Sequence, residues 1–229
     1  MRKFRSILFI CAFAALVVGG ATGLLRVAST TPLILQAEVY EHAAGHAESA
    51  PAGHAHEAEE WEPADGWQRN GLTVLATMVA TFGFALLLAA VSEFAGGIRN
   101  WRAGLLWGSA GFAVFVAAPS LGLPAELPGA PESPLLARQA WWLFAAAATA
   151  GGLALMVFPR RLLLAVIGMA LLVAPHIVGA PAPTAGQALA PALLEHRFLV
   201  TTAIVSLIFW LALGAWLGLS RSWFRERLA

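Results

Sequence analysis

The sequence has few of the charged residues on which soluble domains depend. Charged residues make up 12% of the chain and hydrophobic residues 59%, whereas an average soluble domain is about 25% charged. The formal net charge is +1 and no basic stripe occurs, so we expect no nucleic acid partner. This composition predicts an all-α protein that crosses a membrane several times.

Motifs for disulfides, metal clusters and common catalysis are also missing. The single cysteine, Cys11, lies in the first apolar run, so an intrachain disulfide and a CxxC metal site are excluded. No Walker A loop occurs, and we therefore expect no ATP hydrolysis by this chain. HExxH zinc motifs, nucleophile elbows and haem-attachment motifs are absent as well. We predict that the protein is not an enzyme and holds no permanently bound cofactor.

Long apolar runs are present, and several approach the roughly 20 residues that a helix needs to cross a bilayer. We predict one membrane domain, residues 1–229, with a bundle of about six transmembrane helices. The predicted spans are about 7–27, 70–91, 103–120, 139–158, 162–178 and 198–219. In a five-span alternative, the short third or fifth run is re-entrant or interfacial. The first run follows three cations, as in a signal peptide, and we interpret it as an uncleaved span, with cleavage near residues 20–23 as the alternative.

Charge is distributed unequally between the two sides of these spans. With a cytoplasmic N-terminus, ten of the fourteen Lys and Arg residues fall inside and eleven of the thirteen acids fall outside. Cytoplasmic loops of membrane proteins carry the excess of Lys and Arg. Both termini are therefore predicted to be cytoplasmic, and the loop 28–69 is predicted to face the periplasm or exterior.

The segment from Gln36 to Trp67 combines histidines and acids with no cation. It holds four of the six histidines and eight of the thirteen acids, and it has no Lys or Arg. Imidazole and carboxylate groups suit first-row divalent metals. The candidate ligands here are Glu38, Glu41, His42, His46, His54 and His56. A solvated linker without a metal role is the alternative interpretation.

The spacing within this segment suggests how ligands could meet. On a helix, Glu38, His42 and His46 would share one face because they are four residues apart. His54 and His56 would point the same way on an extended chain. Imidazole ligation does not separate cobalt from nickel, copper or zinc.

Two further candidate metal ligands lie outside this segment. His176 follows Pro175 near the end of the fifth run, and ionisable residues near membrane spans often mark a pathway. Glu126 lies between prolines in a loop too proline-rich for a regular helix. The alternatives are a boundary histidine bonded to a backbone carbonyl and a surface acid of no consequence.

Glycines four residues apart occur in three predicted spans. The GxxxG pairs are Gly19/Gly23, Gly104/Gly108 and Gly214/Gly218. Small residues at this spacing let helix backbones approach closely in lipid. Chance occurrence in an Ala- and Gly-rich chain is the alternative.

Several segments in order resemble those of the CbtA family, described as probable cobalt transporter subunits of bacteria. They are TPLILQAEVYE (31–41), HAHEAEEWEPADG (54–66), APSLGLPAELPGAP (118–131), ARQAWWL (137–143) and APHIVGAP (174–181). The resemblance implies Co²⁺ uptake across the bacterial inner membrane, linked to cobalamin synthesis. Ni²⁺ is the alternative ion, because ligand softness and geometry leave cobalt and nickel nearly indistinguishable. It also implies a small single-span, His-rich partner, CbtB. A ligand role carries over to Glu38, Glu41, His54, His56, Glu126 and His176, whereas His42 and His46 depend on spacing alone.

We therefore expect a membrane subunit of a cobalt uptake transporter whose outer loop collects the metal. One alternative is a membrane-anchored receptor that hands a divalent metal, cobalt or nickel, to another permease. Another is an assembly subunit whose loop docks a protein. The family is usually described with five spans, whereas the charge pattern here favours six.

Overall fold

The computed structural model describes residues 2–48, 63–131, 133–159, 161–183 and 186–226. These residues form helices joined by turns and irregular loops, without a β-strand among them. The predicted all-α class is confirmed. Within the described ranges, five helices are long and apolar enough to cross a membrane: Phe4–Ser29, Trp67–Phe94, Trp101–Ser120, Leu135–Val157 and Ala192–Ser220. A further apolar helix, Leu162–Val178, is shorter.

The N-terminal part of the chain is helical well beyond its apolar run. It comprises α1 (Arg2–Ala14), a π-helical turn η1 (Ala15–Gly19), α2 (Gly20–Ser29) and α3 (Thr31–Glu48). The break at Thr30 is followed by Pro32 in the first turn of α3, where a missing N–H is tolerated. The first half of the Gln36–Trp67 segment is thus mostly helix.

The remaining helices begin and end at residues suited to those positions. Gly66, with a φ of 88°, precedes α4 (Trp67–Phe94), and the Asn100 side chain accepts a hydrogen bond from the Ala103 N–H at the start of α5. Such an N-cap satisfies one of the free donors at a helix start. The other elements are α5 (Trp101–Phe112), η2 (Ala113–Ala117), α6 (Ala118–Ser120), α7 (Leu135–Val157), α8 (Leu162–Val178) and α9 (Ala192–Glu226).

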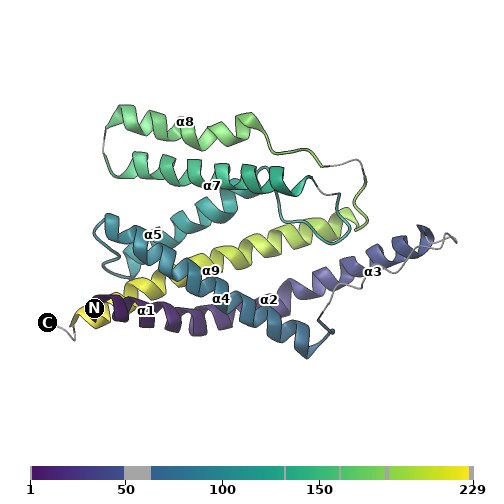
Figure 1. Cartoon of the computed structure of the whole chain (residues 1–229), viewed down its shortest axis with the longest axis horizontal. Helices are drawn as coiled ribbons and strands as arrows, with labels where there is room; N and C mark the ends of the chain where they lie inside the picture. Colours follow the sequence, from purple (N-terminus) through teal and green to yellow (C-terminus); the bar gives the residue numbers. More distant parts are fainter. Residues whose placement is uncertain (1, 49–62, 132, 160, 184–185, 227–229) are drawn as a thin grey trace.

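The long helices run back and forth along one common direction (Figure 1). α7 ends at the same end of the molecule at which α8 begins, whereas α9 begins at the opposite end. α8 therefore brings the chain back between α7 and α9. The start of α1 and the end of α9 lie at the same end of the molecule.

Glycines allow α5 and α9 to touch backbone to backbone. A Cβ atom on Gly104 would overlap the carbonyl oxygen of Gly214, and one on Gly108 would overlap that of Trp210. On α2, a Cβ on Gly23 would lie 2.8 Å from the Val74 Cα of α4. All three GxxxG pairs thus lie at close helix contacts, as Gly218 packs on Asn100 and Gly19 on Met78.

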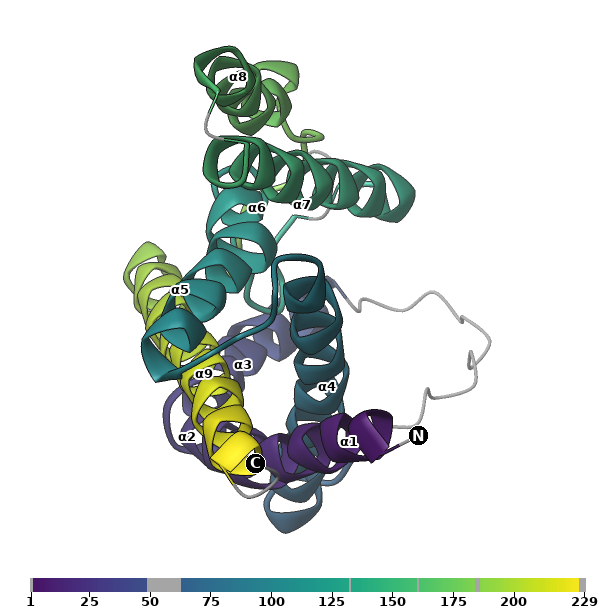
Figure 2. The same cartoon turned by 90° about the vertical axis from the view of Figure 1, so that its left-hand side faces the viewer.

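The helices form two groups. α1, α4, α5 and α9 surround a core that includes Cys11, Leu88 and Leu213, and α7 and α8 form a hairpin to one side of this bundle (Figure 2). Gly152 of α7 and Gly168 of α8 face each other, and a Cβ on either would lie 2.6 Å from the other's carbonyl oxygen. The hairpin joins the bundle mainly through contacts of α7 with η2 and α6.

One end of the molecule carries α3 and the described parts of two loops, 121–131 with 133–134 and 179–183 with 186–191, and we call it the loop end (Figure 1). A small buried cluster joins these segments: Ala37 of α3, Leu127 of the first loop, Ala190 of the second, and Leu194 and Phe198 of α9. The predicted candidates Glu38 and Glu126 are chain neighbours of Ala37 and Leu127. The fold therefore brings both to the same end.

Candidate metal site at the loop end

Glu38 lies on α3 and forms an ion pair with Arg69 from the first turn of α4. Arg69 Nη1 donates to Glu38 Oε2 at 2.9 Å, and Arg69 Nη2 donates to Glu38 Oε1. Both side chains are mostly buried, with 27% of Arg69 and 22% of Glu38 exposed. Arg69 also donates to Asp65 Oδ1 at 2.9 Å. A bidentate pair of this kind is geometrically specific, and it fixes the middle of α3 against the start of α4.

Glu126 forms a second ion pair, with Arg138 of α7. Arg138 Nη2 lies 3.2 Å from Glu126 Oε2. The exposed fraction of the side chain is 29% for Arg138 and 30% for Glu126. The proline-rich loop therefore presents its carboxylate to a cation from the next helix. A divalent ion at Glu38 or Glu126 would therefore compete with a guanidinium for the carboxylate.

His176 packs against an aromatic ring near the end of α8. Its imidazole lies edge-on to Trp141, with ring centroids 6.1 Å apart. Trp141 is 6% exposed, and its Nε1 donates to the Pro175 carbonyl oxygen at 3.3 Å. Gly122 of the first loop packs on the same indole. The imidazole is half-buried, at the point where the α7–α8 hairpin meets the loop end.

The other candidates are distributed differently. Glu41 and His42 are exposed on α3. The backbone of His46 belongs to the last turns of α3, but its side chain lies outside the described part, as do His54 and His56 altogether. Among the side chains that the structure describes, no three His, Cys, Asp or Glu residues lie close enough together to hold a metal ion.

Sequence reasoning missed Arg69 and Arg138 as partners of the candidate ligands. A signal was available: only four cations lie in the segments predicted to face outside, against eleven acids. Asp65 and Arg69 also have the i, i+4 spacing of a helical ion pair. The partner of longest range, Glu38, depends on how α3 packs and carries no local signal.

Comparisons with known proteins identify one family. No curated protein and no solved structure matches the chain. A model of the CbtA family, described as "Probable cobalt transporter subunit (CbtA)", matches residues 4–222 of the 229. The match covers every long apolar helix, α3 and both loops of the loop end. The chain therefore belongs to the CbtA family of probable cobalt transporter subunits, multi-pass membrane proteins.

Proposed function

We propose that this chain is the membrane subunit of a Co²⁺ uptake transporter of the bacterial inner membrane, linked to cobalamin synthesis. The observation that carries the proposal is the family match over residues 4–222. It is supported by the cation-free His- and acid-rich stretch between the first two long apolar helices. Ni²⁺ is the other ion that such ligands would accept.

We also propose six crossings, with the loop end facing the periplasm. α8 has 17 residues, which gives a length of about 25 Å at 1.5 Å per residue. This is at the lower limit of what spans a bilayer, and α8 is the element that returns the chain between α7 and α9. An even number of crossings agrees with the start of α1 and the end of α9 lying together, at the end richest in Arg and Lys.

Metal capture should begin on the histidines of the segment between α3 and α4. Glu38 and Glu126 are held by arginines, so a Co²⁺ ion gains less from these carboxylates than from neutral imidazoles at first contact. His54 and His56 are our first candidates, with Glu41, His42 and His46 as additional ligands. Handover to Glu126 or His176 at the end of the hairpin would follow, with Arg138 released from Glu126.

After capture, we expect the metal ion to cross the membrane beside α7 and α8 and not along the contact between α2 and α4. Arg26 lies on α2, and its Nε is buried without a hydrogen-bond partner among the described groups. A buried cation at this contact would repel a dication. We propose that a small, single-span, His-rich partner of the CbtB type supplies the ligands that this chain's apolar spans lack.

A metal receptor that serves another permease is the second candidate. The middle turns of the apolar helices contain no Asp or Glu, although a dication crossing lipid needs ligands along its path. A receptor would bind cobalt at the loop end without moving it. The two functions separate in proteoliposomes, because the receptor predicts binding without uptake.

Radioactive cobalt uptake tests the proposal. Cells without other cobalt and nickel importers would express this chain alone, with its small partner, or with His54 and His56 changed to alanine. We expect uptake that needs the partner and falls at least tenfold in the variant. Binding by the purified chain without uptake in any combination would favour the receptor.

A further inference from the structure

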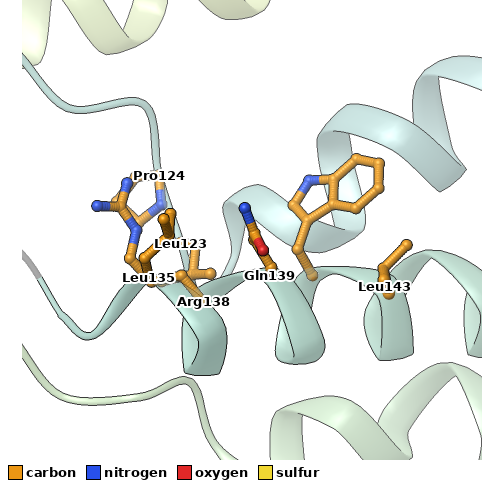
Figure 3. Close-up of a pocket in the computed structure, with 7 residues that line it drawn as sticks. Leu123, Pro124, Leu135, Arg138, Gln139 and Leu143 are labelled. Atoms are coloured by element: carbon orange, nitrogen blue, oxygen red, sulfur yellow. The ribbon is translucent and has the colours of Figure 1, made fainter.

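A groove of about 580 Å³ lies beside the first turns of α7. Leu123 and Pro124 of the preceding loop form one wall (Figure 3). The other lining residues come from α7 itself: Leu135, Arg138, Gln139, Trp142 and Leu143. The volume lies within the range of about 300–1,000 Å³ typical of small-molecule sites.

From Arg138 onward, the α7 side chains that line this groove change from polar to apolar along the helix. Arg138 and Gln139 lie at one level of α7, and Trp142 and Leu143 follow four residues later on the same face. One helical turn, about 5.4 Å, therefore separates two hydrogen-bond donors from two apolar side chains. α7 enters the membrane in this direction, since its long apolar run continues to Val157. Hydrogen-bond donors therefore come first and apolar side chains lie deeper, which matches a phospholipid whose phosphate is at the headgroup level and whose acyl chains are deeper.

The surroundings of the groove agree with a lipid ligand. Leu143, on the deeper side of the donors, is 61% exposed on an apolar helix, so its outer surface meets acyl chains in a membrane. Tryptophan is favoured at the level where headgroups give way to hydrocarbon. A guanidinium recognises phosphate with directed N–H donors, and Arg138 stands at the polar end of the groove.

We propose that this groove binds an anionic phospholipid. Its phosphodiester accepts hydrogen bonds from the Arg138 guanidinium and the Gln139 amide, and one acyl chain lies on Trp142 and Leu143. Glu126 competes with the phosphate for Arg138, because its carboxylate is 3.2 Å from Arg138 Nη2. The groove is thus a lipid site coupled to a candidate metal ligand, and its existence does not depend on cobalt transport.

Native mass spectrometry of the purified full-length chain, titrated with phosphatidylglycerol or phosphatidylcholine, tests this directly. We expect Arg138→Gln to weaken phosphatidylglycerol binding about fivefold, the effect of one basic residue near an anionic lipid, and to weaken binding of phosphatidylcholine, which has the same phosphate but no net charge, by less. Glu126→Gln should strengthen phosphatidylglycerol binding, because it removes the competitor. Arg197→Gln, at an exposed arginine near the start of α9, is the matched control and should change neither lipid.

Two further arms distinguish the ligand source and guard against misfolding. Millimolar inorganic phosphate should not displace the lipid, whereas displacement would show that the site binds phosphate without an acyl chain and would overturn the proposal. A phosphatidylglycerol with a photoreactive acyl chain should label the wild-type α7 peptide that contains Trp142 and Leu143. Labelling confined to other helices, or equal effects of Arg138→Gln and Arg197→Gln in folded protein, would also overturn it.

Discussion

Replacement of Arg69 by glutamine should raise the affinity of the loop end for cobalt while lowering its stability. The Arg69–Glu38 pair is bidentate and about a quarter exposed, at 27% and 22%. Exposed ion pairs are worth about 0.2–1 kcal/mol, and breaking a buried one costs about 3–5 kcal/mol. For this intermediate burial we take about 1–2 kcal/mol.

That free energy sets the size of the expected change in metal affinity. When a cobalt ion binds Glu38 in the wild type, the ion pair between Glu38 and Arg69 must break. Since 1.4 kcal/mol corresponds to a factor of ten in affinity, Arg69→Gln should tighten Co²⁺ binding by about 5- to 30-fold. Glu38→Gln should leave the wild-type affinity nearly unchanged, because its carboxylate is already held by Arg69.

Isothermal titration of the purified full-length chain with Co²⁺ measures the affinity. A maleimide dye that reacts with Cys11 can report unfolding, because Cys11 is the only cysteine and is 0% exposed. Each single variant should lower the thermal midpoint, and the double variant should lower it by less than the sum. A loss of affinity in Glu38→Gln with no change in Arg69→Gln would refute the reasoning and make Glu38 a primary ligand.

Three other changes have defined outcomes. Gly108→Leu should destabilise the fold by about 1–3 kcal/mol through overpacking. The control Gly83→Ala should leave the stability unchanged, because Gly83 has open space around it. Labelling of Cys11 during heating measures both variants. Trp141→Phe removes the hydrogen bond to the α8 backbone and should cost about 0.5–1.5 kcal/mol in the same assay. The double variant His54→Ala with His56→Ala should weaken Co²⁺ binding at pH 7.5 and make the affinity less dependent on pH. Imidazole side chains ordinarily protonate near about pH 6.5, and imidazolium cannot bind metal. Titrations with Co²⁺ at pH 5.5 and 7.5 measure both effects.

The fold class and the helix contacts were predictable because lipid leaves few choices. A backbone in hydrocarbon must satisfy its own hydrogen bonds, so apolar runs become helices. α8 has the limits of its apolar run, 162–178, since Arg161 and Gly179 flank it. The GxxxG pairs were open to chance, but each lies at a close contact because only glycine fits there.

The candidate site was less predictable, since its partners come from distant parts of the chain. Spacing placed Glu38 on a helix face and α3 is helical there, but nothing local indicates that Arg69 of α4 occupies its carboxylate. The pairing of Glu126 with Arg138 likewise depends on how the proline-rich loop folds back on α7. The π-helical turns η1 and η2 were not predicted from the sequence either.

The shortness of α8 has a consequence for the membrane itself. Its 17 residues give about 25 Å, and the hydrocarbon layer is about 30 Å thick. A helix too short for its bilayer is accommodated by local thinning or by flanking residues that reach for the interface, and Arg161 directly precedes α8. On the proposed six-span topology, thinning beside the hairpin would lower the barrier to a dication there, and lipid thickness would be a variable that tunes transport.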